Sequence, residues 1–176
     1  MQRLLDRLAN TPVAVHDATW TLIHANAPYD ALMGQSTSWR GIERNSIWRH
    51  LIGPGTRAVH TPDEQADFEA RLVADLRLTA ARYPADQRLK QLTRDLAAQS
   101  PRFIELWESG DLEPHQDYGR HKIIDHPAVG HITLDCDTLI DAADDLRITI
   151  YTAEPETEDA ERLALAIVLG TQSLID

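Results

Sequence analysis

The chain has 176 residues, of which 43% are hydrophobic and 26% are charged, and its formal net charge is −11. This length and balance are typical of one soluble globular domain and exclude a disordered chain, and no apolar run approaches the roughly 18 residues that cross a bilayer. The acidity argues against binding of duplex DNA by this chain alone, because a phosphate backbone requires clustered Lys and Arg.

The composition also bears on the compartment of the protein. The single cysteine, Cys136, excludes an internal disulfide, and no basic and apolar leader opens the sequence. We therefore expect a cytoplasmic protein with no membrane association. Cys136 lies within an alternating apolar segment, which predicts a buried and inert thiol rather than a nucleophile.

The first third of the chain predicts a short helix, a β-hairpin and two further helices. Residues 2–10 have leucines on one helical side, and residues 12–26 alternate about a turn near Asp17, as a hairpin does. Residues 28–33 predict the next helix, and residues 43–52 have apolar side chains at helical spacing until a Gly-Pro-Gly sequence stops them.

The middle of the chain predicts three consecutive helices. Residues 61–64 supply a threonine cap, a proline for the first helical position and a glutamate three residues after the threonine. An apolar stripe with a period of about 3.6 residues then continues to Tyr83. Asp86 and Ser100 are suited to cap the two helices that follow.

After these helices the pattern changes to a period of two. Residues 122–124, 132–137 and 146–151 alternate as half-buried strands do, and residues 141–145 form a polar turn. A last helix begins near Thr157, where acidic residues favour its positive end. The chain order is two strands, a multi-helix insertion and three strands. It predicts an α+β fold with a PAS-like five-stranded antiparallel sheet.

Residues 100–107 and 122–130 look like the wall of a pocket, since they contain no activated nucleophile, phosphate loop or set of metal ligands. Ligand pockets are mostly apolar with a few fixed polar groups, and a set of this kind lies beside the elements expected to enclose a cleft. We expect the ligand to contact Asn26, Tyr29, Arg44, Asn45, Trp48, Phe68, Leu72, Leu76, Phe103, Trp107 and His126. Arg44 is the natural partner of a carboxylate, because a guanidinium forms two parallel hydrogen bonds with it.

These residues also have structural interpretations, which the sequence leaves open. Arg44 would then pair with an acidic residue on an exposed helix face, and Asn26 would end a strand in a turn. The aromatic residues of the set would pack in the core. His126, which precedes a proline, would be a corner residue with its hydrogen bonds satisfied.

Metal and enzyme sites are not predicted. The histidines that crowd one region, beside Asp117, are His115, His121, His126 and His131. The five-residue spacing of the last three places them on alternating faces of an extended chain, and no HxH pair or HExxH motif occurs. No GxSxG motif is present either. We therefore expect no metal, no cofactor and no enzymatic activity.

The chain resembles the ligand-binding domain of the MmyB-like transcription regulators along nearly its whole length. The segments that match in order and spacing are Thr11-Pro12 with the hairpin and Asn26, Glu43-Arg44-Asn45, Pro84-x-Asp86 with Leu89 and Leu92, Ser100-Pro101-x-Phe103 with Leu106-Trp107, His126-Pro127-x-Val129-Gly130, and Tyr151-Thr152-Ala153-Glu154-Pro155. The sequence departs from the family at Ala25, where members often have an aromatic residue. Members carry a helix-turn-helix domain upstream, and residues 2–10 would be the tail of a linker to such a domain unless the protein naturally has none.

The resemblance implies a bacterial regulator whose PAS-like domain binds a small apolar molecule, and a fatty acid is the family-level expectation. The protein would contact DNA only through a helix-turn-helix domain. Residues 1–10 would be an N-terminal helix or linker remnant, and residues 11–176 would be the ligand-binding domain. The alternative function is a stand-alone small-molecule or acyl-binding protein, or an acyl hydrolase, on the same PAS-like frame.

The last helix has more apolar residues than one core-facing stripe requires, and exposed apolar surface usually marks an interface. These residues are Leu163, Leu165, Ile167, Val168, Leu169, Leu174 and Ile175. The pattern predicts a homodimer through the terminal helices. The alternative is that the helix is buried on two sides within one domain.

Overall fold

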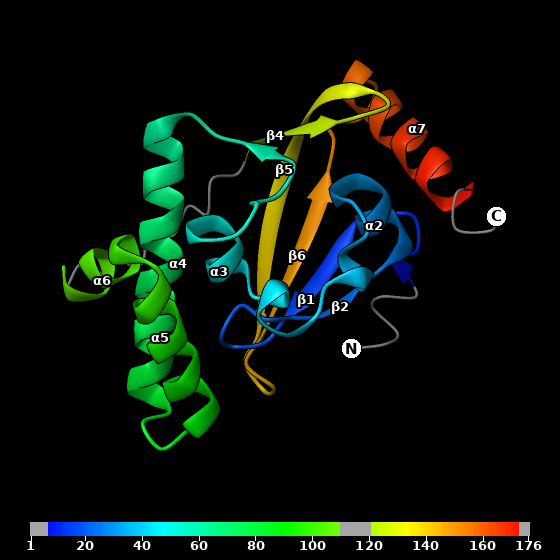
Figure 1. Ribbon diagram of the computed structural model, residues 1–176. Coiled ribbons are helices and arrows are strands. Elements are labelled where there is room, and N and C mark those ends of the chain that lie inside the picture. The colour runs from blue at the N-terminus through cyan, green and yellow to red at the C-terminus, as the bar shows by residue number, and fades with distance from the viewer. Residues whose placement is uncertain (1–6, 110–120, 173–176) are drawn as a thin grey trace.

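An antiparallel sheet of six strands forms the centre of the computed structural model, in which residues 7–109 and 121–172 are described (Figure 1). The strands are β1 (Val13–His16), β2 (Leu22–Ala25), β3 (Ala58–Val59), β4 (His121–His126), β5 (Gly130–Asp141) and β6 (Leu146–Thr152). Their order across the sheet is β2-β1-β6-β5-β4-β3, so the first hairpin lies beside the last strand. The α+β fold class predicted from the sequence is confirmed.

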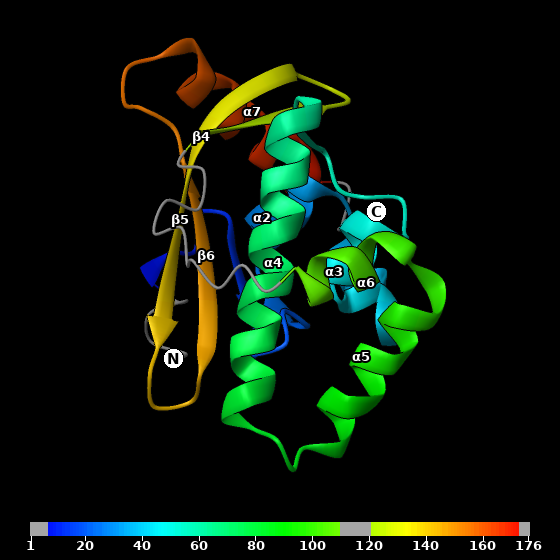
Figure 2. The same ribbon diagram turned by 90° about the vertical axis from the view of Figure 1, so that its left-hand side faces the viewer.

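Helices fill the chain between β2 and β4, as the sequence predicts. They are α2 (Ala27–Met33), the 3₁₀ turns η1 (Ser36–Ser38) and η2 (Gly41–Arg44), α3 (Ser46–Leu51), α4 (Pro62–Arg82), α5 (Gln87–Gln99) and α6 (Pro101–Glu108), and α7 (Glu158–Gln172) follows the sheet. Figure 2 shows α2, α3 and α4 on one side of the strands. None of the helices in the described ranges is long and apolar enough to cross a membrane. The helix expected over residues 2–10 lies mostly outside those ranges.

The long helices begin where the sequence predicts, because side chains satisfy their first backbone N–H groups. The hydroxyl of Thr61 accepts a hydrogen bond from the N–H of Glu64 at 3.3 Å, and the Glu64 carboxylate accepts one from the N–H of Thr61 at 2.7 Å. Asp86 caps α5, and Ser100 caps α6 through the N–H of Phe103 at 3.1 Å. Each cap contributes roughly 1 kcal/mol.

The prediction of five strands was one strand short. β3 lies within the helical insertion and pairs with the edge of β4, where Ala58 is opposite Ile124. A strand of two residues is too short to show an alternating pattern, so its sequence contains no signal of period two. Pairing with β4, which comes more than sixty residues later in the chain, is what makes it a strand.

Two separate hydrophobic clusters lie on the helical side of the sheet. The sheet cluster consists of Ala14, Leu22, Tyr29, Leu32, Met33, Ile124, Ile132, Leu134, Cys136, Tyr151 and Ala166. The helix cluster consists of Trp20, Ile47, Leu72, Val73, Leu76, Leu89, Leu96 and Phe103. The sheet cluster joins the strands to α2 and α7, whereas the helix cluster holds α3, α4, α5 and α6 together. The insertion therefore has a core of its own.

The two faces of β1 and β6 are both buried. On the face away from the helices, Val13, Val15 and Ile148 form a small third cluster, with Leu8 packed against it. Side chains alternate along a strand, so Arg147 points to the opposite face, toward α4.

Helix α7 crosses α2 at very short range. A Cβ atom added to Gly170 would collide with the side chain and backbone of Ala31. Glycine is thus required at this position for α7 and α2 to pack. Both helices contribute side chains to the sheet cluster, so their contact closes part of that cluster.

Candidate ligand-binding site

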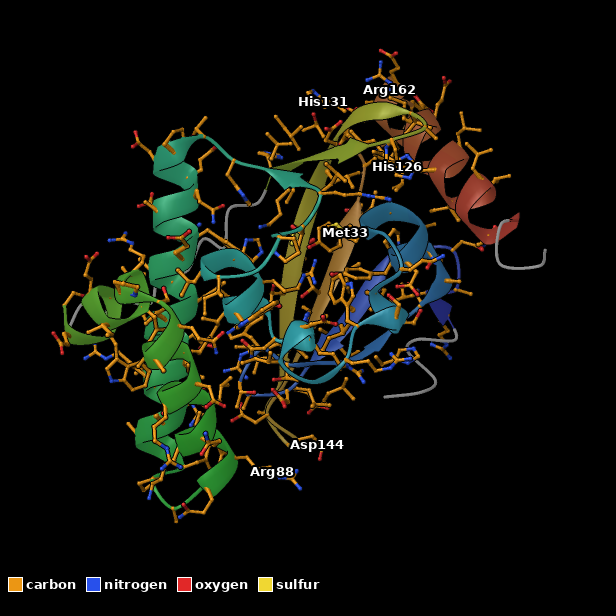
Figure 3. The ribbon with its side chains drawn as sticks, in the orientation of Figure 1. Met33, Arg88, His126, His131, Asp144 and Arg162 are labelled. Atoms are coloured by element: carbon orange, nitrogen blue, oxygen red, sulfur yellow. The ribbon has the colours of Figure 1, made fainter. Side chains whose placement is uncertain are left out.

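A narrow cavity of about 70 Å³ lies between the sheet cluster and the helix cluster. Its lining from the strands and their turns is His16, Trp20, Ala58, Lys122, Cys136, Thr138, Thr149 and Tyr151. Its lining from the helices and the loop before β3 is Tyr29, Met33, Ser46, His50, Thr56, Phe68, Arg71 and Leu72. Figure 3 shows Met33 between α3 and the strands. The cavity therefore lies at the boundary between the sheet cluster and the helix cluster.

The phenols and the thiol in this lining are neutral. The rings of Tyr29 and Tyr151 lie 6.0 Å apart between centroids, and burial raises the pKa of both hydroxyl groups well above the usual value. Burial also raises the pKa of Cys136, which makes a side-chain hydrogen bond with Tyr151. A thiol that stays protonated is a poor nucleophile, so the predicted inert cysteine is consistent with this site.

One end of the cavity is cationic. Lys122 is only 8% exposed, and its Nζ lies 4.1 Å from the centroid of the Phe68 ring, which is a cation–π contact. Desolvation lowers the pKa of this ammonium, and the charge of Arg71 lowers it further. Lys122 and Arg71 line both this cavity and a hollow of about 200 Å³ next to it.

Two buried histidines face the same space. Burial, with a smaller effect from Arg147, lowers the pKa of His16 to about 4, and its Nδ1 has no hydrogen-bond partner within the described residues. Burial lowers the pKa of His50 to about 3, and the charge of Lys122 adds to this effect. The ring of His50 packs edge-on against Phe68 at 4.7 Å. Both imidazoles are therefore neutral near pH 7.

The C-terminal half of α4 is attached to the sheet by a buried polar network. Asp75 accepts hydrogen bonds from Nε1 of Trp20 at 2.7 Å and from Nε of Arg147 at 2.8 Å, and it pairs with Nη2 of Arg147 at 2.8 Å. The hydroxyl of Thr79 donates to the carbonyl of Ala18 at 3.0 Å. We call this network the α4 latch. It fixes the helix one turn beyond the cavity.

The structure brings together three of the eleven residues expected at the site: Tyr29, Phe68 and Leu72 line the cavity. Leu76 and Phe103 are buried inside the helix cluster, and the ring of Trp107 stacks on that of Phe103 at 5.3 Å. Trp48 also packs against the helix cluster. These four side chains lie behind α4 or beside it rather than in the cavity.

The two asparagines cap helices. Asn26 accepts hydrogen bonds from the N–H groups of Val13 and Tyr29, at 2.9 and 3.0 Å. Asn45 accepts from the N–H of Trp48 at 3.1 Å and donates to the carbonyl of Thr19 at 2.8 Å. Both amide groups hold the backbone where the hairpin meets the helices, so the polar signal in the sequence reflects capping at these positions.

Arg44 and His126 also lie away from the cavity. Nη2 of Arg44 donates to the carbonyl of Ile23 at 3.0 Å. Nε2 of His126 lies 3.0 Å from the carbonyl oxygen of Ala31, in a separate hollow that Arg57 also lines. In Figure 3, His126 lies near α7, at a distance from Met33.

Lys122, His16 and His50 line the cavity but were not among the residues expected at the site from the sequence. Lys122 precedes Ile124 and His126 by two and four residues, so all three share one face of β4, and the structure buries all three. The period of two therefore contained the signal: a lysine in register with a buried isoleucine points inward. His16 and His50 gave no comparable signal.

The histidine region contains no metal site among residues 7–109 and 121–172. On the exposed face of β4 and β5, Nδ1 of His121 lies 2.8 Å from Asp135, and Nε2 of His131 lies 3.6 Å from Asp125. His115 and Asp117 lie outside the described ranges.

These features define a class: an α+β domain with a buried and largely apolar cavity between a sheet and an inserted helical layer. Residues 1–166 match the family described as MmyB-like transcription regulator ligand binding domain, and the chain belongs to that family. The resemblance noted in the sequence is thus confirmed. The family is one of regulator domains rather than of enzymes. The comparison with curated proteins gave no match.

Proposed function

We propose that the chain is the effector-sensing domain of a transcription regulator and that the cavity between α4 and the sheet receives the apolar part of a small molecule, for which a fatty acid is the best candidate. The observation that supports this most is the position of the cavity. It lies between two separate cores, where helices and sheet can part without breaking either core.

The cavity must widen to hold such a ligand. Its volume of about 70 Å³ is below the roughly 300–1,000 Å³ of ligand pockets. The N-terminal half of α4 moves outward in our proposal, because the α4 latch holds only the other half. Burial of about ten methylenes, at roughly 0.8 kcal/mol each, gives a gross gain near ~8 kcal/mol. The entropy lost on binding offsets a large part of this, so an affinity in the micromolar range is expected.

The strand order supports the PAS-like part of the proposal. If β3 is set aside as an edge addition, the order β2-β1-β6-β5-β4 remains, which is two N-terminal strands beside three C-terminal strands with the helices inserted between them. The domain would contact DNA through a helix-turn-helix partner domain and would act in the cytoplasm. Its own charge of −11 disfavours direct contact with phosphates.

Dimerisation through α7 remains a proposal. Leu165 and Val168 are each 50% exposed and Leu169 is 41% exposed, which leaves apolar surface on this helix for a second copy of the chain. Leu174 and Ile175 lie outside the described residues. Sedimentation at tens of micromolar tests this proposal, because a species of 19.8 kDa would be the monomer.

Calorimetry on delipidated protein tests the ligand proposal. We expect dodecanoic acid to bind with micromolar affinity and Ala58→Phe to weaken this binding at least tenfold, because the new ring would fill the cavity beside β3. Leu139→Phe is the control, since Leu139 is 49% exposed on β5 and lines neither the cavity nor the hollow beside it. If wild-type protein binds neither dodecanoic acid nor dodecanol, the proposed function is contradicted.

A further inference from the structure

We propose that Lys122, assisted by Arg71, is the anchor for the negatively charged head group of the ligand, so that the domain selects a carboxylate amphiphile over a neutral one of the same length. This inference rests on the proposed function. It goes beyond it by naming the charge that the site recognises and the residue that recognises it.

The first observation is the location of Lys122 at a boundary. The apolar cavity and the more open hollow beside β3 share three lining residues, Phe68, Arg71 and Lys122. The far side of the hollow is polar and includes His60 and Glu64. An amphiphile with its tail in the cavity therefore has its head group between these two spaces, against Lys122.

The second observation is the state of the ammonium group. The described residues supply Lys122 with no hydrogen bond and no carboxylate within ion-pair distance, and its contact is with the ring of Phe68. A buried ammonium without an anionic partner is costly, and the charge of Arg71 adds repulsion. A carboxylate placed here would compensate the charge of Lys122, which a hydroxyl group cannot do.

The acidic residue that lines the hollow within the described ranges is already engaged. Glu64 lines the hollow, but its carboxylate accepts hydrogen bonds from the N–H and the hydroxyl of Thr61 at 2.7 and 2.9 Å. It therefore belongs to the cap of α4. Among residues 7–109 and 121–172, no carboxylate therefore pairs with Lys122, and the proposal gives this place to the carboxylate of the ligand.

Arg44 was the head-group partner expected from the sequence. Its guanidinium donates to the carbonyl of Ile23 and does not line the cavity, so a tail in the cavity would leave the head group out of its reach. The anchor proposed here moves this role to β4.

The sequence offers a matched control, because it contains only two lysines, Lys90 and Lys122. Lys90 is exposed on α5. We would measure the binding of dodecanoic acid and dodecanol by calorimetry to wild-type protein, Lys122→Met and Lys90→Met. Methionine keeps the length of the buried stem and removes the charge.

We expect wild-type protein and Lys90→Met to prefer the acid over the alcohol by roughly ten- to a hundredfold, the range of a charge-assisted hydrogen bond. Lys122→Met should lose most of this preference and keep its affinity for dodecanol. Its melting temperature without ligand should equal or exceed that of wild type, because no ion pair is lost. A lysine with a purely structural role would instead lower the melting temperature and leave the preference unchanged.

Equal affinities of wild-type protein for acid and alcohol, or unchanged acid binding in Lys122→Met, would overturn the anchor and leave the apolar pocket standing. Binding of neither compound to wild-type protein would overturn the pocket as well. If Lys122→Met does not fold, NMR spectra of wild-type protein labelled with [¹³Cε]lysine test the anchor instead. These spectra contain only two lysine signals, because the chain has only two lysines. Dodecanoic acid must shift the Lys122 signal more than dodecanol does and leave Lys90 in place, and any other pattern rules out the anchor.

Discussion

The two halves of α4 contact the rest of the protein through different chemistry. The C-terminal half is fixed by the α4 latch, in which Asp75 and Thr79 make directional hydrogen bonds to Trp20, Arg147 and Ala18. The N-terminal half faces the cavity with the apolar side chains of Phe68 and Leu72 and with Arg71. Hydrogen bonds between buried charged groups specify one geometry, whereas apolar contact is non-directional and tolerates rearrangement.

If the proposed function holds, this difference gives the two halves different parts in ligand entry. A helix held at one end by directional hydrogen bonds, and at the other by ring contacts such as that of Phe68 with His50, can tilt about the first end. The cavity lies one to two turns from Asp75, on the side of α4 that would tilt outward. Substitutions in the latch, in the cavity lining and at the last turn of α4 test this difference.

The largest effect is expected for Asp75→Ala, which removes the acceptor at the centre of the latch. Arg147 would remain buried without its carboxylate partner, and breaking such a pair costs about 3–5 kcal/mol of unfolding free energy. Urea unfolding followed by circular dichroism measures this loss. Asp67→Ala, at an exposed position on the same helix, should change stability by no more than about 0.5 kcal/mol. A loss below about 1 kcal/mol in Asp75→Ala would show that the latch does not hold α4.

Two leucines one turn apart on α4 compare the halves directly. Both belong to the helix cluster, but Leu72 also lines the cavity whereas Leu76 does not. We expect Leu76→Ala to cost about 3–4 kcal/mol and Leu72→Ala about 2 kcal/mol, because the side chain of Leu72 lacks packing partners on its cavity side. Unfolding in urea gives both values. The comparison fails if the two substitutions cost the same, or if added dodecanol stabilises the Leu76→Ala protein more than the Leu72→Ala protein.

Acid should lower the free energy of unfolding through His16, which lines the cavity. The lowered pKa of about 4 in the folded protein means that the unfolded chain, with a histidine pKa near 6.5, binds more protons between these values. Stability is therefore lost as the pH falls from about 6.5 to 4, by up to about 3 kcal/mol. His16→Gln should show a smaller loss between pH 7 and 4.5 than wild type does. The control is His24→Gln at an exposed position, and an identical pH dependence in all three proteins would contradict the prediction.

The smallest effect is expected for Arg82→Ala at the last turn of α4. The Arg82 side chain is 59% exposed and pairs with Asp145 at 3.0 Å, and exposed pairs contribute about 0–1 kcal/mol. Asp145 keeps the hydrogen bond from the hydroxyl of Tyr83 in this variant. Unfolding in urea at low and high salt should give nearly equal stabilities. A loss of stability as large as that of Asp75→Ala would show that the latch extends to the end of the helix.

The local elements could be predicted from the sequence because their signals are local. Thr61, Asp86 and Ser100 cap α4, α5 and α6 with their own side chains, and a period of two along β4 and the first part of β5 reflects one buried face. The family could be predicted as well, since several short segments keep their order and spacing. In each case the residues that decide the outcome lie within a few positions of one another.

The site depended on contacts that only the tertiary structure provides. Asn26, Asn45 and Arg44 have the chemistry of ligand contacts, but the fold places backbone groups within their reach, and these groups satisfy them first. Lys122 and His16 come from distant strands and meet at the cavity only when the sheet is complete. Local sequence patterns were enough to predict most of the helices and strands and the family. The folded chain decided which polar groups the backbone satisfies and which remain to face the cavity, because that depends on distances between segments far apart in the chain.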